Sequence, residues 1–407
     1  MDGHETSAWR KRPAPAPPLP RRWVSHARHD AQAPHAQAVG VAPRPSTSSQ
    51  QRETPPVSPP PPSSPKLIKL DGATGEGGGQ ILRTALSLSL LTGRPFRIVR
   101  IRANREKPGL RPQHLKAVEA AALLCGGAVT GGAIGSRELT FHPAPYTPAD
   151  LRVDVGTAGA TTLILHALAL PIALRAEAAV RLTLTGGTFN LAAPSYPFLR
   201  ETWRRHMAAL GLPIALSSPL AGFYPKGGGQ LDAWIEPGTP RALTLLDRPP
   251  LVRIRGEAGT ANLRHHDIAH RMRDRVLVRL AARGLDAEIG LADWPSPGVG
   301  AAIALTAEHG DTASTFVGLG ERGKPAEAVA DEAVDELLAF EDAAGAVDPH
   351  SADQLLLPLA MAEGRSVYTV AAVTEHLRTN IQTIRAFLDR PIRIDEPEGA
   401  PPRVVVG

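Results

Sequence analysis

Apolar and polar residues follow two different periods in the first part of the chain that carries regular patterns. An alternating stretch at 67–72 predicts a strand, and a helical pattern at 82–93 follows it and ends in a glycine. Three further segments repeat these strand and helix patterns, at 95–103, 113–127 and 138–143. The order strand, helix, strand, helix, then strand or strand pair predicts one α/β module.

A similar order recurs further along the chain. A strand pattern at 150–156 precedes an apolar helix at 161–174, a strand at 180–187 and a helix around 198–212. Helices repeatedly end in a glycine followed by a strand, and the tetrapeptide GGGQ occurs twice. These echoes predict repeated βαβαββ-type modules within an α/β (α+β) fold.

The order of strand and helix patterns changes between about Arg248 and Gly345. One basic helix pattern at 267–284 stands among several strand patterns there, and the earlier style resumes after it. We therefore predict a large domain formed by 66–247 and 346–407, with a smaller α/β domain at 248–345 inserted into it.

The first 65 residues have a different composition from the rest. They hold 15 of the 40 prolines and show neither helical nor strand periodicity, so we predict a disordered tail at 1–65. The tail carries eight Lys/Arg and four Asp/Glu, a net charge of +4, whereas the whole chain is +5. The remaining residues are therefore close to neutral, and only local clusters of charge can argue for an acidic partner.

Cysteine content and hydropathy narrow the class of protein. Cys125 is the single cysteine, which excludes a disulfide framework and suits a reducing compartment. The longest apolar run, LILHALALPIAL, is too short to span a bilayer, and the N-terminus lacks the apolar core of a signal peptide. We expect a cytoplasmic protein with no membrane partner.

The segment GEGGGQ at 75–80 is the first candidate for chemistry. Glycines surround Glu76, and a helix follows at once, so backbone N–H groups can converge on an anion. The plainer interpretation is a tight strand-to-helix turn. A carboxylate in an anion loop makes sense if a divalent cation bridges it to a phosphate, which makes Glu76 a candidate metal ligand.

A basic patch follows the second predicted strand. From Arg94 to Lys116 the chain has eight Lys/Arg and one acidic residue. Arg102 and Arg105 leave the end of a strand, where arginines can make two-point contacts with phosphate. A solvated basic loop is the alternative. Aromatic residues do not alternate with the basic ones in this stretch, so it does not predict a base-stacking platform.

A carboxylate and an imidazole occur near the C-terminus. Asp353 and Gln354 stand at the head of a predicted apolar helix, and His376 stands at the start of another. Asp353 could simply cap its helix, and His376 could be an ordinary polar residue near a helix start. A carboxylate can also orient an imidazole that acts as a nucleophile.

Taken in order, these motifs resemble those of RNA 3′-terminal phosphate cyclases. The resemblance covers residues 66–395 and rests on seven ordered segments: DGATGEGGGQILRTALSLSLLTGRPFRI, RANREKPGLRPQHLKAVEAAALLCGG, GTAGATTLILHALALP, GGTFNLAAPSYPF, GFYPKGGGQL, ADQLLLPLA and EHLRTNIQTIRAFL. It implies an ATP-dependent ligase with a divalent cation, Mg²⁺ or Mn²⁺. It also implies that a histidine attacks the α-phosphorus of ATP and passes AMP to an RNA 3′-phosphate, which the 2′-OH then cyclises.

The resemblance also assigns roles to residues of this chain. His376 matches the nucleophile and Glu76 the metal-linked carboxylate. Pro194 matches a proline that lies against adenine. The phosphate-contacting and nucleotide-pocket positions fall on Arg83, Arg102, Arg105, Gln113, Asp353 and Gln354. Two positions depart from the family pattern and bear on nucleotide affinity: His350 replaces a frequent tyrosine, and His166 replaces a usual glutamine.

Two other functions remain as alternatives. A non-catalytic relative that serves as a ribosome-assembly or RNA-binding scaffold would lack the nucleophilic histidine, which this chain has at His376. An enolpyruvyl-transferase-type enzyme would share the modules, but the EHLRTN and GEGGGQ motifs argue against it. The oligomeric state is not predicted.

Overall fold

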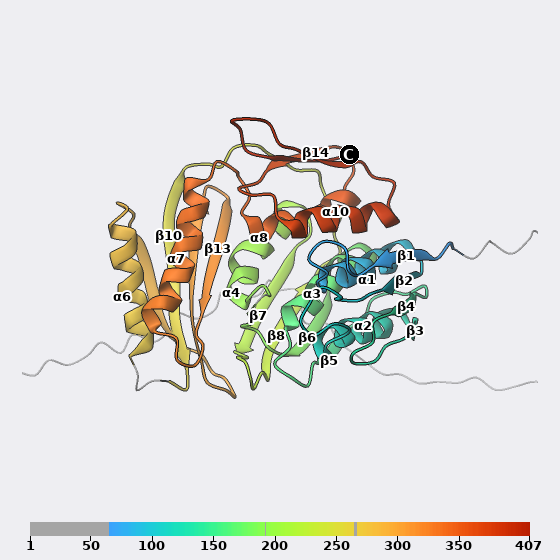
Figure 1. The fold of residues 1–407 in the computed structure, drawn as a ribbon, viewed down its shortest axis with the longest axis horizontal. Coiled ribbons are helices and arrows are strands. Elements are labelled where there is room, and N and C mark those ends of the chain that lie inside the picture. Colours follow the sequence, from blue (N-terminus) through green and yellow to red (C-terminus); the bar gives the residue numbers. More distant parts are fainter. Residues whose placement is uncertain (1–64, 192, 264–266) are drawn as a thin grey trace, which may run out of the picture. The chain divides into compact units, whose positions relative to one another are not determined.

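The computed structural model describes residues 65–191, 193–263 and 267–407 (Figure 1). The predicted tail lies, except for Pro65, outside the described residues. Four 4-stranded sheets and their helices make up the described part of the chain. None of the helices in these ranges is long and apolar enough to cross a membrane.

The first sheet belongs to the first predicted module. Its elements are β1 (Ile68–Asp71), α1 (Gln80–Thr92), β2 (Phe96–Val99), α2 (Pro112–Cys125), β3 (Ala128–Thr130) and β4 (Leu139–His142). The strand order is β1-β2-β4-β3, with β1 and β2 parallel and the other pairs antiparallel. Both helices end at glycines with positive φ, Gly93 and Gly126, where a residue without a Cβ is favoured.

The second sheet repeats this topology. Its strands are β5 (Leu151–Asp154), β6 (Val180–Gly186), β7 (Ile214–Leu220) and β8 (Gly229–Ile235), in the order β5-β6-β8-β7. Its helical segments are α3 (Thr161–Arg175) and the continuous run of α4 (Tyr196–Phe198), a π-helical turn (Leu199–Trp203) and α5 (Arg204–Ala209). The predicted helix around 198–212 is therefore present and contains a π-helical turn.

A third copy of the topology is split in the sequence. Its strands are β9 (Thr244–Leu245), β14 (Ser366–Thr369), β15 (Ile392–Asp395) and β16 (Arg403–Val406). Their order is β9-β14-β16-β15, with β9 and β14 parallel, so first, second, fourth and third strands lie side by side as in the other two copies. Its helices are α8 (Pro349–Ala352), α9 (Leu356–Met361) and α10 (Glu375–Phe387). This arrangement confirms the prediction of repeated βαβαββ modules.

The remaining sheet lies between β9 and β14 in the sequence. Its elements are β10 (Leu251–Ala261), α6 (Ile268–Ala281), β11 (Ala287–Asp293), β12 (Gly300–His309), β13 (Thr312–Leu319) and α7 (Ala326–Asp342). The strand order here is β11-β10-β12-β13, which differs from the other three sheets. The described residues form one compact unit, so the predicted domain boundaries at 248 and 345 stay a prediction.

Charged side chains connect this fourth sheet to the second module. Glu308 of β12 accepts hydrogen bonds from Arg205 of α5 at 2.7 Å and from Arg253 and Arg255 of β10 at 2.6 and 2.9 Å. Arg255 also donates to Glu201 in the π-helical turn. Glu308 is buried, and a buried carboxylate needs such partners, so the network favours one arrangement of the two sheets.

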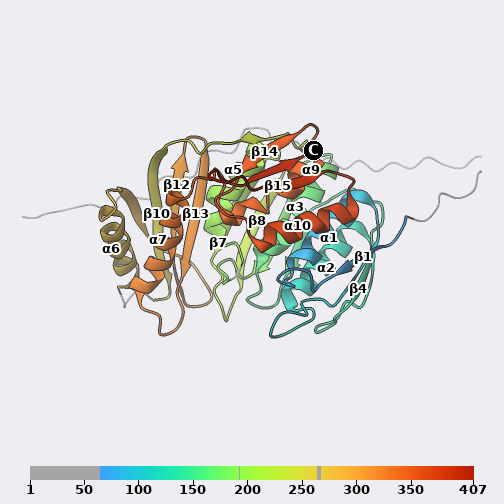
Figure 2. The same cartoon turned by 45° about the horizontal axis from the view of Figure 1, so that its top comes forward.

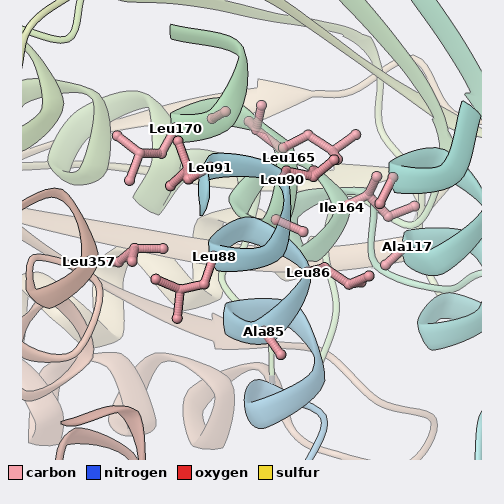
Figure 3. Close-up of a cluster of buried hydrophobic side chains, with 14 of the residues drawn as sticks. Ala85, Leu86, Leu88, Leu90, Leu91, Ala117, Ile164, Leu165, Leu170 and Leu357 are labelled. Carbon is pink, nitrogen blue, oxygen red and sulfur yellow. The ribbon is translucent and has the colours of Figure 1, made fainter. Parts of the chain in front are cut away.

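The largest hydrophobic core surrounds α1. Figure 3 shows Leu86, Leu88 and Leu90 of α1 beside Ile164 of α3 and Leu357 of α9, and these residues belong to one buried cluster. In both Figures 1 and 2, α10 lies along α1. α1 therefore packs against helices of all three repeated modules, and the segments that flank its N-terminus acquire defined positions.

The predicted strand at 95–103 ends earlier than expected. β2 stops at Val99, because Arg100 and Arg102 have φ values of 53° and 54°, in the left-handed region. Arg100 pairs with Asp71, and the backbone N–H of Ile101 bonds to Arg137 instead of continuing the ladder. The basic segment thus turns away from the sheet directly after β2.

Candidate active site

Three segments meet at the N-terminal end of α10: the glycine-rich loop before α1, the basic loop before α2, and α10 itself. Nε2 of His376 lies 3.1 Å from Oε2 of Glu76. The same oxygen accepts a hydrogen bond from Arg105 at 2.8 Å. These three side chains are 42–44% exposed, so a ligand in solution can reach them.

Local backbone chemistry brings the glycine-rich loop against α10. Thr374 caps the helix by accepting a hydrogen bond from the backbone N–H of Leu377, so His376 stands in the first turn. Gly75 has φ of 59°, and a Cβ added there would collide with Oγ1 of Thr379. Asn104 donates to the backbone carbonyl of Ala73 at 2.8 Å, which ties the basic loop to the glycine-rich loop.

Asp353 lies at the junction between α8 and α9. Its carboxylate accepts a hydrogen bond from the Gln80 side chain at the start of α1. Burial raises the pKa of Asp353 to about 6, although the nearby His376 and Arg83 act in the opposite direction. The alternative that Asp353 caps the apolar helix after it is wrong, because α9 has Leu355 at its N-cap position and no side chain caps it.

Arg83 contributes positive charge next to Asp353. Burial lowers the pKa of Arg83 to about 10, so its guanidinium still carries a proton at neutral pH. Within 65–191, 193–263 and 267–407, the Arg83 guanidinium has no hydrogen-bond partner. A half-buried cation of this kind is suited to an incoming anion such as a phosphate.

Arg102 and Gln113 mainly hold loops in place. Arg102 donates to the backbone carbonyls of Lys107 at 2.6 Å and Gly109 at 3.2 Å. Its pKa is lowered by burial and by the neighbouring Arg111 and Arg105, so positive charge accumulates in this loop. Gln113 accepts a hydrogen bond from the backbone N–H of Ala160 at 3.3 Å and so links α2 to the start of α3.

His114 is a site residue that we did not predict. Its side chain is buried beneath the glycine-rich loop, and a Cβ at Gly79 would collide with its Nε2. Burial and the charges of Arg83, Arg102 and Arg111 lower its pKa to about 3, so it is neutral at physiological pH. Nδ1 accepts from the backbone N–H of Arg111 at 3.2 Å, which places the ring proton on Nε2. The sequence signal that could have identified His114 is its position directly after Gln113, a predicted site residue.

A cavity of about 90 Å³ lies beside Arg83 and Asp353. His166 and Gln354 line it, and among the described residues neither Nε2 of His166 nor Oε1 of Gln354 has a hydrogen-bond partner. The His166 ring packs 5.0 Å from the ring of Trp203, centroid to centroid. Buried polar atoms usually have partners, so this cavity is suited to water molecules or to polar groups of a ligand.

His350 and Pro194, the two residues expected near adenine, lie outside α1, α2 and α10. His350 stands on α8, where its Nε2 lies 3.3 Å from Glu336 of α7, and this hydrogen bond raises the pKa of His350. Gln354 donates to the backbone carbonyl of His350 at 2.6 Å. Pro194 is half-buried in the segment between β6 and α4.

Comparison with known proteins identifies the family of this chain. The sequence profile described as RNA 3′-terminal phosphate cyclase matches residues 74–394. The chain belongs to the RNA 3′-terminal phosphate cyclase family. The RNA 3′-terminal phosphate cyclase of Ralstonia nicotianae is 44% identical over 324 residues, which cover 79% of this chain and 91% of that protein.

Cyclase relatives from distant organisms give similar values. The RNA 3′-terminal phosphate cyclase of Pseudomonas fluorescens is 43% identical over 330 residues, or 81% of this chain and 94% of the relative. That of Pyrobaculum neutrophilum is 40% identical over 343 residues, or 83% and 97%. The match therefore spans nearly the whole length of these cyclases and includes every predicted site residue from Glu76 to His376.

Glu76 provides the carboxylate predicted to bind a divalent cation. Among the residues that the structure describes, no group of three or more His, Cys, Asp or Glu side chains could hold a metal ion by itself. A single carboxylate still suits Mg²⁺, which is commonly held by one or two carboxylates together with substrate phosphates and water. The donor set therefore fits a cation that binds together with the nucleotide.

The lowered pKa of the half-buried His166 leads us to expect a measurable pH dependence of stability. A histidine in the unfolded chain has a pKa near 6.5, whereas burial, with a smaller contribution from Arg83, lowers the pKa of His166 to about 3 in the folded protein. Between these values the unfolded chain binds the proton and the folded protein does not, so the free energy of unfolding decreases as the pH falls. We expect His166→Gln to lose less stability than the wild type between pH 7 and pH 5 in urea unfolding.

His142→Gln is the matched control, because His142 is exposed on β4. This variant should lose as much stability as the wild type over the same pH interval. Equal losses in the wild type and His166→Gln would contradict the prediction.

Proposed function

We propose that this protein converts an RNA 3′-terminal phosphate into a 2′,3′-cyclic phosphate and consumes ATP in doing so. The observation that carries the proposal is the position of His376 at the start of α10, with Nε2 facing the carboxylate of a glycine-rich loop and Arg105 on the same carboxylate. Membership of the cyclase family supports the same reaction. A non-catalytic scaffold would not need this constellation.

In the first step, Nε2 of His376 attacks the α-phosphorus of ATP. A nitrogen–phosphorus bond forms, the bond from the α-phosphorus to the bridging oxygen breaks, and pyrophosphate leaves. Negative charge develops on the α-phosphate oxygens and on pyrophosphate. Arg105, which pairs with Glu76, and Arg83, which lies near Asp353, supply positive charge near this position, and fixed charges aimed at developing charge lower the barrier.

The hydrogen bond to Glu76 has a consequence for the tautomer of His376. A carboxylate only accepts hydrogen bonds, so Nε2 carries a proton in this arrangement. A nucleophilic nitrogen needs a free lone pair. We therefore expect Glu76 to leave Nε2 when nucleotide binds, while the ring proton resides on Nδ1.

A divalent cation would neutralise phosphate charge at this position, and Glu76 is the residue that would hold it. A divalent cation, Mg²⁺ or Mn²⁺, is part of the proposal. Arg105 would then be free to contact the nucleotide phosphates, because the cation would take its place on the carboxylate.

In the remaining steps AMP passes from His376 to the RNA 3′-phosphate, and the adjacent 2′-OH attacks the activated phosphorus. The oxygen–phosphorus bond of the ring forms, and AMP leaves. The 2′-OH belongs to the same ribose, so the protein needs to supply little beyond positioning for the closing step. Positive charge at Arg102 and Arg105 is suited to the RNA phosphates.

The adenine contacts of Pro194 and His350, and the nucleotide contacts of Gln113, His166, Asp353 and Gln354, belong to this proposal. The cavity beside Arg83 and the orphaned atoms of His166 and Gln354 support a polar ligand at this point. A cytoplasmic location and the domain boundaries at 248 and 345 also remain proposals.

Arg105→Ala should slow the attachment of AMP to the protein. Loss of a hydrogen bond to a charged group costs about 1.5–3 kcal/mol, which corresponds to roughly 10- to 100-fold in rate. Arg97→Ala is the matched control, because Arg97 lies in the same basic segment but pairs with Glu138 on the surface of the first sheet. Single-turnover labelling with ATP carrying a labelled α-phosphate measures both variants, and equal rates would remove Arg105 from the site.

The substrate preference tests the proposed function as a whole. An RNA that ends in a 3′-phosphate should give a cyclic phosphate, and a 3′-hydroxyl RNA should give no product. An RNA with a terminal 2′-deoxyribose 3′-phosphate should stop as the adenylylated end, because it lacks the 2′-OH nucleophile. Products can be separated by gel electrophoresis. A cyclic product from the 3′-hydroxyl RNA, or equal behaviour of all three RNAs, would contradict the proposal.

A further inference from the structure

A closed set of hydrogen bonds connects α1, α10 and the α8–α9 junction. Asn380 of α10 accepts a hydrogen bond from Oγ1 of Thr84 at 2.7 Å and donates to the backbone carbonyl of Asp353 at 2.8 Å. The Asp353 carboxylate accepts from Gln80, which stands one helical turn before Thr84 on α1. We call these four residues, Gln80, Thr84, Asp353 and Asn380, the polar clamp.

The chemistry of these groups fixes how the clamp is oriented. The backbone carbonyl of Asp353 can only accept, so the amide nitrogen of Asn380 must face it. The amide oxygen therefore faces Thr84, and the Thr84 hydroxyl must be the donor. Thr84 and Asn380 are both buried, so removing either partner leaves the other unpaired away from water.

Asn380 stands four residues after His376 on α10, one turn further along the same side of the helix. Thr84 and Asn380 are 296 positions apart in the sequence, so the clamp joins two helices that no local structure holds together. The hydrophobic contacts between α1 and α10 are non-directional and would tolerate a shift of one helix along the other. The hydrogen bonds require specific donor and acceptor positions, so they fix the position of α10 along α1.

We infer that Asn380 is a positioning residue for the reaction of His376. This inference rests on the proposed function. Asn380 fixes the position of α10 along α1 through its hydrogen bond to Thr84. α1 begins directly after the glycine-rich loop that carries Glu76. Through Asp353 it also holds the carboxylate that lies near His376 and Arg83. The clamp thus sets the distance between the nucleophile and the nucleotide without touching the reacting atoms.

Matched threonine variants test this role. Thr84→Val removes the hydroxyl that bonds to Asn380 and keeps the size of the side chain. Thr383→Val makes the same change at a buried threonine of α10, whose hydroxyl, among the described residues, bonds to the backbone carbonyl of Thr379 in its own helix. Thr84→Ser restores the hydroxyl. Asn380→Ala removes the centre of the clamp, and the threonine variants keep the test valid if Asn380→Ala does not fold.

Single-turnover labelling with α-labelled ATP over a range of ATP concentrations provides the readout. A displacement of about 1 Å at a reacting group can cost on the order of 100-fold in rate. We expect Thr84→Val and Asn380→Ala to lower the maximal labelling rate by at least about tenfold, with a much smaller change in the half-saturating ATP concentration. Thr383→Val and Thr84→Ser should label at close to the wild-type rate.

The outcomes separate this inference from the proposed function. Absence of labelling in the wild type would overturn the proposed function itself. If the wild type is labelled, and folded Thr84→Val reacts as fast as Thr383→Val, the positioning role of the clamp is wrong. Failure of Thr84→Ser to recover the rate would also contradict it, because the hydroxyl is then not the group that matters.

Discussion

The close approach of α10 to α1 and to the loop before it is the interaction on which the site depends. Gly75 permits it, because any side chain there would collide with Thr379. The polar clamp then fixes how the helices meet, and His376 comes within hydrogen-bond distance of Glu76. His376 by itself is a residue at an ordinary helix start, and Glu76 by itself belongs to an ordinary loop. The two side chains form a pair because the first and third modules meet at this point.

The split third module explains why the site residues are so far apart in the sequence. Its first strand, β9, precedes the fourth sheet, whereas its remaining strands and α10 follow that sheet. Parallel pairing of β9 with β14 closes the module across this separation. The ion-pair network around Glu308 and Glu201 then links the fourth sheet to the second module. Two long-range connections therefore support a site made from segments about 300 residues apart.

Periodicity and glycine positions predicted most of the fold, because they report local geometry. The helices that end at Gly93 and Gly126 follow from the left-handed conformation that glycine favours. The early end of β2 was not predictable in this way, since Arg100 adopts a positive φ that its residue type does not favour. Asp353 does not cap the apolar helix after it, because that helix, α9, begins only at Leu356, and a separate short helix, α8, capped by Asp348, precedes it.

The sequence motifs predicted which residues belong to the site better than they predicted the contacts that these residues make. Glu76, Arg105 and His376 lie together as the cyclase resemblance implied, although their roles remain proposals. The neutral His114 and the clamp residue Asn380 escaped prediction, because their significance comes from burial and from partners on other modules. Electrostatic environments such as that of Asp353 arise only once distant segments are packed together.

The most direct test of the central claim is to locate covalently bound AMP. The wild-type chain would be incubated with ATP and Mg²⁺, denatured, digested with trypsin under conditions that preserve phosphoramidates, and analysed by mass spectrometry. We predict one acid-labile adenylyl group on the tryptic peptide 366–378, in which His376 is the single histidine. Cyclisation of RNA without this adduct, or an adenylyl group on a different peptide, would contradict the account.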